Sequence, residues 1–156
     1  MEEELRDALA RRAAGVAVIC ARDDAGYRAM TATSLASASA DPPLIVVGLE
    51  SLTTTRDAVV GARAFTVSLL SRQQEFLSDR LAGRAPMVDP SWREVPHFSA
   101  PSGLPVIQGS IGWFDCALED VFPAGDHELV LGRVLAAGVG PGDPLILWDR
   151  AYWTIS

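Results

Sequence analysis

The sequence contains no lysine, so all 13 of its basic residues are arginines. This absence excludes Schiff-base catalysis and the lysine-dependent phosphate loop of P-loop proteins. The 20 acidic residues outnumber the arginines and give a formal net charge of -7. Because such a chain repels phosphate backbones, we expect no nucleic-acid partner.

Cysteine and histidine are also scarce, with two of each. Cys20 and Cys116 are far apart in sequence, and neither has a second cysteine or histidine at metal-ligand spacing. His97 and His127 are too few for a histidine-rich metal site. We therefore expect no metal, and two buried structural thiols rather than a redox pair.

No long hydrophobic run is present. The longest aliphatic stretch spans residues 44–49, whereas crossing a bilayer takes roughly 20 apolar residues. The acidic start Met1-Glu2-Glu3-Glu4 differs from the basic start of a signal peptide. We therefore expect no membrane partner and a cytoplasmic location. Glycine-rich dinucleotide loops and the Gly-x-Ser-x-Gly nucleophile elbow are missing as well.

The length of 156 residues favours one domain over residues 1–156. Hydrophobic periodicity and turn residues predict that it is mainly β. Many short strands with only two or three short helices favour a closed antiparallel barrel. Residues 84–103 carry four prolines and are expected to form a long covering loop. The expected helices span residues 2–12, 57–61 and 71–82. The expected strands span residues 16–21, 27–33, 44–49 (buried on both faces), 64–70, 104–118 (a strand pair or one bent strand), 128–139 and 145–155 (closing the sheet).

Two clusters of small polar residues could hold a ligand. Met30-Thr31-Ala32-Thr33-Ser34 ends a strand, and small side chains there let a planar ligand approach the backbone. The alternative is a β edge whose threonines serve strand propensity. Ser51, Thr53, Thr55 and Arg56 surround a helix start, which predicts either a phosphate cradle or ordinary helix capping.

Two further clusters lie in the second half of the chain. Gly125-Asp126-His127 places a histidine at a strand entrance, where it could orient a ligand or transfer a proton. The alternative is a turn histidine hydrogen-bonded to Asp126. Asp149-Arg150-x-Tyr152, taken alone, favours an exposed ion pair beside a packed tyrosine.

Taken in this order, the clusters resemble the flavin reductase-like family, the small NAD(P)H:flavin oxidoreductases that partner two-component monooxygenases. The resemblance runs from about residue 15 to residue 152, nearly the whole chain. It is carried by these motifs: Gly15-Val16-Ala17-Val18-Ile19, Met30-Thr31-Ala32-Thr33-Ser34, Asp41-Pro42-Pro43-Leu44, Thr53-x-Thr55-x-Asp57, Phe65-Thr66-Val67-Ser68-Leu69-Leu70, Gly125-Asp126-His127, Gly132-x-Val134 and Asp149-Arg150-x-Tyr152.

The resemblance implies a mainly β fold, a split antiparallel β-barrel of the FMN-binding type. It also implies FMN or FAD as the flavin, NADH or NADPH as the hydride donor, and a homodimer with the flavin near the subunit interface. A partner monooxygenase would receive the reduced flavin by diffusion. Two alternatives stay open: a flavin-binding protein without reductase activity, and a flavoenzyme that acts on its own small organic substrate.

The resemblance also suggests roles for individual residues. The isoalloxazine would be lined by Thr31, Ala32, Thr33 and Ser34. The flavin phosphate would be held by Ser51, Thr53 and Thr55, with the turn Ala82-Gly83-Arg84 closing over it. His127 would be the catalytic residue beside the nicotinamide, on a side shaped by Asp149, Arg150 and Tyr152.

One position departs from the family in the region that would hold the phosphate. Glu50 stands where asparagine is common in the family. With no lysine in the chain, any phosphate must be met by hydroxyls, backbone amides and arginine, and Arg56 and Arg84 are the candidate arginines.

Overall fold

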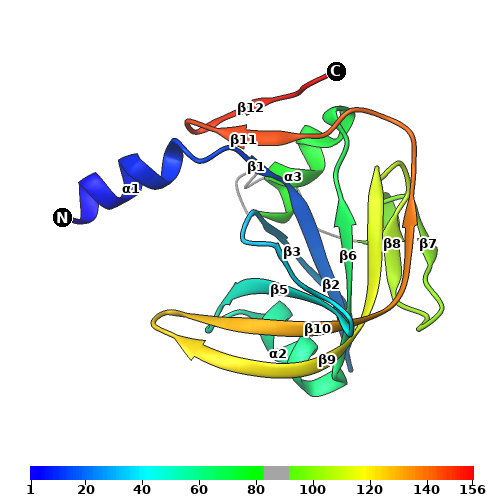
Figure 1. Ribbon diagram of the computed structural model, residues 1–156. Coiled ribbons are helices and arrows are strands. Elements are labelled where there is room, and N and C mark those ends of the chain that lie inside the picture. Colours follow the sequence, from blue (N-terminus) through cyan, green and yellow to red (C-terminus); the bar gives the residue numbers. More distant parts are fainter. Residues whose placement is uncertain (83–91) are drawn as a thin grey trace.

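The computed structural model describes residues 1–82 and 92–156, and the chain is built mainly from antiparallel strands (Figure 1). The helices of these ranges are α1 (Glu2–Ala10), α2 (Thr54–Ala62) and α3 (Glu75–Leu81), with the 3-10 turns η1 (Arg72–Gln74) and η2 (Trp92–Glu94). The strands are β1 (Ala14–Gly15), β2 (Ala17–Asp23), β3 (Gly26–Ala32), β4 (Ala36–Ala40), β5 (Pro43–Glu50), β6 (Ala64–Leu69), β7 (His97–Ser99), β8 (Pro105–Ile107), β9 (Gly112–Ala124), β10 (His127–Val139), β11 (Ile146–Trp148) and β12 (Ala151–Trp153). The expected mainly β class with short helices is confirmed.

Seven strands form one sheet in the order β3-β2-β6-β9-β10-β5-β4. The sheet curves so strongly that β3, at one edge, contacts β5 near the other. Just after β3, the Ser34 hydroxyl donates to the Gly48 carbonyl of β5 at 2.8 Å and accepts from the Gly48 amide at 3.1 Å. The curvature therefore brings the end of β3 next to β5. Two smaller sheets, β1-β11-β12 and β7-β8, complete the pairing.

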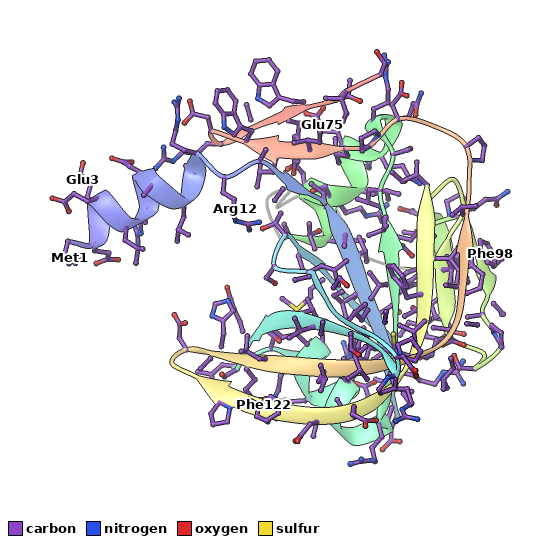
Figure 2. The ribbon with its side chains drawn as sticks, viewed as in Figure 1. Met1, Glu3, Arg12, Glu75, Phe98 and Phe122 are labelled. Atoms are coloured by element: carbon purple, nitrogen blue, oxygen red, sulfur yellow. The ribbon has the colours of Figure 1, made fainter. Side chains whose placement is uncertain are left out.

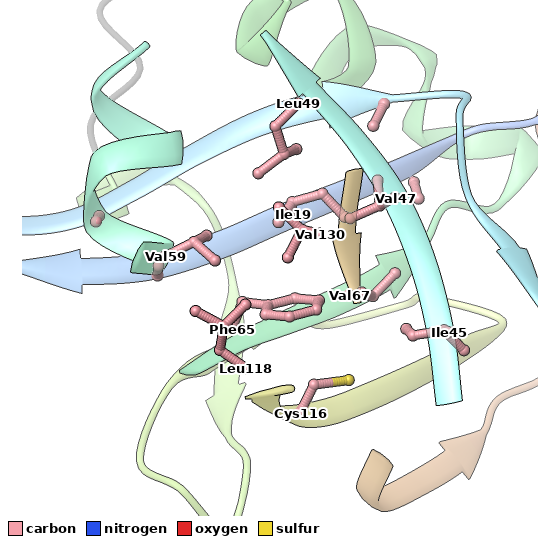
Figure 3. Packing of buried hydrophobic residues seen from close by; sticks show 14 residues of the cluster. Ile19, Ile45, Val47, Leu49, Val59, Phe65, Val67, Cys116, Leu118 and Val130 are labelled. Atoms are coloured by element: carbon pink, nitrogen blue, oxygen red, sulfur yellow. The ribbon is translucent and has the colours of Figure 1, made fainter. Parts of the chain in front are cut away.

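The main hydrophobic core lies inside this curve (Figure 3). Ile19, Val47, Phe65 and Val130 come from four strands and are fully buried. Helix α2 adds Val59 to the same cluster. Because each strand presents alternate residues to this space, the curved sheet and α2 enclose one continuous apolar cluster.

A second cluster lies on the other side of β2. It contains Val18 and Leu70 together with Leu81 of α3 and Leu145, while Ile19 points to the main core. Strand β2 is therefore buried on both faces, which explains why residues 16–21 are continuously apolar.

Both cysteines are buried and unpaired, as expected from their isolation in the sequence. Cys116 belongs to the main core, and burial raises the pKa of its thiol to about 12. Burial likewise raises the pKa of Cys20 well above its usual range. The expected burial of both thiols is confirmed, and burial disfavours the thiolate form that reacts.

The observed strands correct three expectations. Residues 44–49 are not buried on both faces: Ile45, Val47 and Leu49 are buried, while the residues between them are partly exposed. Only one face of β5 meets the core, which produces this alternation. Residues 145–155 do not close the main sheet, because β11 pairs with β12 on one side and with β1 on the other, in a separate sheet. Strand β4 was not expected, since its Ala-Ser repeat carries no hydrophobic alternation.

The remaining differences are at element boundaries. Helix α2 begins at Thr54 rather than residue 57, and α1 ends at Ala10 rather than residue 12. The stretch 104–118 is neither a strand pair nor one bent strand: β8 pairs with β7, and β9, which continues to Ala124, belongs to the main sheet. The expected loop 84–103 includes η2 and β7 in its second part, and residues 84–91 lie outside the described ranges. None of the described helices is long and apolar enough to cross a bilayer.

Candidate functional site

The end of β3 meets α3 and the β11–β12 hairpin at a small pocket. Its volume is about 100 Å³, and Thr31, Ala32, Thr33, Ala82 and Tyr152 are among its lining residues. A neighbouring pocket of about 250 Å³ shares Thr33 and Leu147 with the first and is also lined by Arg12, Asp149 and Arg150. The fold thus gathers seven of the predicted site residues around two adjoining pockets: Thr31, Ala32, Thr33, Ala82, Asp149, Arg150 and Tyr152.

Hydrogen bonds join three elements in the wall of the smaller pocket. The Tyr152 hydroxyl donates to Oδ1 of Asp79 at 2.7 Å. Since a tyrosine hydroxyl has one proton, the Ser78 hydroxyl is the donor in its 2.7 Å contact with Tyr152. The Thr31 hydroxyl donates to the Ser78 carbonyl at 2.7 Å. These bonds tie β3, α3 and β12 together and fix the orientation of the tyrosine ring.

The sequence reasoning missed Ser78 and Asp79. A signal for Ser78 exists, because Ser71 and Gln74 form a capping box that sets the start of the helical segment. From there, residues 74, 78 and 81 recur at helical spacing and are all buried on one face. Nothing local indicates that this face meets Tyr152, which lies 74 residues further along the chain.

The β11–β12 hairpin turns through two residues in left-handed backbone conformations. Asp149 has φ +50° and Arg150 has φ +63°, while Trp148 pairs with Ala151. Two successive positive φ values are the signature of a type I′ turn, which suits a two-residue hairpin. For residues other than glycine such a conformation costs about 1–3 kcal/mol each, so surrounding contacts must hold it.

Contacts with the N-terminal segment hold this turn. The Asp149 amide donates to the Ala10 carbonyl at 2.7 Å, and Arg150 pairs with Asp7 at 2.7 Å. Arg11 pairs with Asp149 at 3.5 Å. Asp149 and Arg150 are therefore exposed ion-pairing residues, but their partners lie on and just after α1 and not within the Asp149-Arg150-x-Tyr152 motif. Arg12 points away from α1 (Figure 2) and donates to the Thr33 carbonyl at 3.2 Å.

The other predicted residues meet at the start of α2. The Thr53 hydroxyl accepts from the Arg56 amide at 3.2 Å and donates to the Glu50 carbonyl at 3.0 Å. The Ser51 amide donates to the Asp126 carbonyl at 3.0 Å, and His127 lies opposite Glu50 in the β5–β10 pairing. Thr53 is therefore a helix cap, as one of the two readings of this cluster expected.

The hairpin that carries His127 is also a tight turn. Gly125 has φ +67° and Asp126 has no positive φ, which is typical of a type II′ turn with glycine in first position. Nδ1 of His127 lies 2.8 Å from Oδ1 of Asp126. This contact lowers the pKa of Asp126, so the expected turn hydrogen bond is present. The His127 side chain remains 42% exposed and can still meet a ligand.

Thr55, in the first turn of α2, and Ser34 are the remaining predicted residues that the structure describes, and two others cannot be placed. Thr55 is only 3% exposed, so its side chain offers little surface to a ligand. Ser34 joins the two regions through its bonds to Gly48 of β5. Gly83 and Arg84 lie outside the described residues. In the described ranges no cluster of three or more histidine, cysteine or acidic side chains could hold a metal ion.

Comparisons with known proteins show which sequences and structures this chain is similar to. A family model described as "Flavin reductase like domain" matches residues 9–156. The reductase component of 4-hydroxyphenylacetate 3-monooxygenase from Thermus thermophilus is 35% identical over 97% of this chain and 95% of that protein.

Two solved structures have the same fold. The styrene monooxygenase flavin reductase from Pseudomonas putida has a TM-score of 0.86 and 34% identity, over 97% of this chain and 97% of that chain. The flavin reductase component of a bacterial two-component tryptophan halogenase has a TM-score of 0.90 and 31% identity, over 99% of this chain and 98% of that chain.

Proposed function

Because the chain belongs to the flavin reductase-like family, we propose that it transfers a hydride from NADH or NADPH to FMN or FAD. One observation carries the proposal. The matched chain folds so that Thr31, Ala32 and Thr33 face Ala82 and Tyr152 across one pocket, with Asp149 and Arg150 beside it. Residues that the family resemblance relates to the flavin and the nicotinamide thus lie together.

The residues around the pocket suit a flat ring with polar edges. Ala32 and Ala82 are too small to obstruct a planar ligand, and Val16 and Leu147 add apolar surface. The Thr33 carbonyl and the Thr31 and Tyr152 hydroxyls supply polar groups at fixed positions. Apolar walls with a few oriented polar groups are what ligand pockets generally offer.

In such a reaction the flavin ring supplies the hydride acceptor and the nicotinamide supplies the hydride. The chain's residues then have to bind and orient the two rings, since hydride transfer needs close contact and no strong acid or base. The bonded set Thr31, Ser78, Asp79 and Tyr152 keeps one wall rigid. His127, held by Asp126, would orient the nicotinamide from the β9–β10 hairpin.

The assembly and setting of the protein are also part of the proposal. A homodimer is supported by α1, which has no buried residue and leaves Leu5 and Leu9 more than half exposed. Reduced flavin would pass by diffusion to a partner monooxygenase. A cytoplasmic location is supported by two unpaired cysteines. A single domain is supported by β2, whose two faces join both hydrophobic clusters.

The test is a nicotinamide oxidation assay with purified protein. NADH and NADPH are each mixed with FMN and with FAD, and the loss of nicotinamide absorbance is followed against a control without protein. We expect turnover with at least one pair. Absence of turnover with all four pairs would refute the reductase function. Tight flavin retention without nicotinamide oxidation would instead support a flavin-binding protein, and turnover of a small molecule with retained flavin would support a flavoenzyme with its own substrate.

A further inference from the structure

The corner at the start of α2 is strongly acidic. Residues 50–57 and 126–128 build it, and the bond from the Ser51 amide to the Asp126 carbonyl joins the two segments. Their charged side chains are one arginine, Arg56, and four carboxylates, Glu50, Asp57, Asp126 and Glu128. An anion placed here would meet a net negative field unless Arg56 faced it.

Arg56 is already engaged by two of those carboxylates. Its Nε and Nη2 donate to the two oxygens of Glu128 at 2.6 and 2.8 Å, a bidentate pair. Its Nη1 donates to Asp57 at 3.0 Å. The Glu128 side chain is 17% exposed and the Arg56 side chain 26%, so the pair is partly shielded from water. The positive charge is neutralised within the protein.

Two other donors of the corner are also engaged. The Thr53 hydroxyl proton goes to the Glu50 carbonyl, and the Ser51 amide goes to Asp126. A phosphate at this helix start would therefore depend on the Ser51 and Thr54 hydroxyls, the His127 ring and the first free amides of α2. It would gain no unpaired cation from residues 50–57 or 126–128.

We propose that Glu128 is a specificity-determining residue, because it prevents Arg56 from binding the flavin phosphate. This inference rests on the proposed function. Because Glu128 pairs with Arg56, the protein binds the flavin through its ring system and not through its phosphate. The substrate class is then the isoalloxazine with its ribityl chain, with or without phosphate. Riboflavin, which lacks the phosphate, should bind about as well as FMN.

Equilibrium binding tests this directly. Quenching of flavin fluorescence gives Kd for riboflavin and for FMN with the purified protein, at low and at physiological ionic strength. We expect the two Kd values to agree within about fivefold, the range of one exposed charge interaction. Added salt should tighten FMN binding, because it screens repulsion, and leave riboflavin binding unchanged. An FMN preference above about tenfold, or FMN binding weakened by salt, would overturn the inference.

Two variants of equal charge change isolate Glu128. Glu128→Gln releases Arg56 from its bidentate partner and should tighten FMN about fivefold while leaving riboflavin unchanged. Glu119→Gln is the control, since Glu119 pairs with Arg133 at 3.3 Å on the same β9–β10 hairpin. It should change neither Kd. If FMN binds more tightly by the same factor in both variants, the change in net charge explains the effect and the role of Glu128 is refuted. The role is also refuted if Glu128→Gln does not bind FMN more tightly than the wild type.

A third variant guards against misfolding. Arg56→Gln combined with Glu128→Gln replaces the ion pair by neutral side chains and should keep the wild-type ratio of the two Kd values. A fall in FMN affinity alone would show that Arg56 holds the phosphate. Reduction of flavins with a strong FMN preference would refute this inference and leave the proposed function standing. A wild-type protein that binds and reduces no flavin would refute both.

Discussion

Replacing Gly132 by alanine should destabilise the protein through a collision in the main core. A Cβ atom at this position would lie 2.5 Å from Cζ and 3.0 Å from Cε1 of the Phe65 ring, and 3.1 Å from Cβ of Cys116. Phe65 is fully buried in the packed cluster, so the ring has no solvent-facing space into which it can move. Forcing a methyl group into a well-packed core costs about 1–3 kcal/mol.

The backbone effect opposes this cost. Glycine in a strand is about 0.5–1 kcal/mol less favourable than alanine, so the substitution regains part of the loss. The net expectation for Gly132→Ala is a loss of up to about 2.5 kcal/mol in the free energy of unfolding. Gly61→Ala is the matched control, because a Cβ on that helical glycine has no neighbour within 4 Å. It should stabilise the protein by about 0.5–1 kcal/mol.

Urea unfolding followed by tryptophan fluorescence measures both variants at one fixed protein concentration. The midpoint should fall for Gly132→Ala and rise for Gly61→Ala, with unchanged slopes. Combining Gly132→Ala with Phe65→Leu, which shortens the colliding side chain, should cost about 1 kcal/mol less than the sum of the single changes. Equal midpoints for the two alanine variants, or an additive double variant, would refute the collision.

The remaining predictions concern the site and the assembly. Tyr152→Phe removes the hydrogen bonds of the Tyr152 hydroxyl with the buried Ser78 hydroxyl and with the Asp79 carboxylate. It should lower the free energy of unfolding by about 1–3 kcal/mol and weaken flavin binding, as measured by urea unfolding and by fluorescence titration. Wild-type values in both measurements would contradict the role of these hydrogen bonds. His127→Ala should raise KM for the nicotinamide with flavin Kd largely kept, whereas unchanged nicotinamide kinetics would leave the residue with only its turn role. Leu5→Ser with Leu9→Ser should convert a dimer to a monomer in light scattering, since both side chains are more than half exposed in the single chain; an unchanged mass would show that α1 does not contact a second copy.

Local patterns predicted the parts of this protein that depend on neighbouring residues. The cap at Thr53, the turn at Gly125 and the apolar strand around Ile19 are set by contacts within a few positions of the chain. Strand β4 escaped prediction, because the alternation of small alanines and serines gives no periodic signal and its pairing with β5 supplies the order.

The candidate site divides in the same way. Thr31 and Tyr152 could be named from motifs, but their common partner Ser78 could not, because its role depends on α3 packing between β3 and β12. The engagement of Arg56 is a second case. The sequence shows Arg56 only as a cation beside a helix start. The pairing of β5 with β10 brings Glu128 next to Arg56.

The sequence by itself determined an acidic, lysine-free chain, its alternating strands and the residue types that the site can use. The tertiary structure alone decided which of these residues share a surface. Helix caps and turns are closed by residues three or four positions apart, so the local sequence is sufficient to predict them. Glu128 and Arg56 are 72 positions apart, and Tyr152 and Ser78 are 74 apart. Such pairs form only after long loops are closed by the packing of the whole sheet.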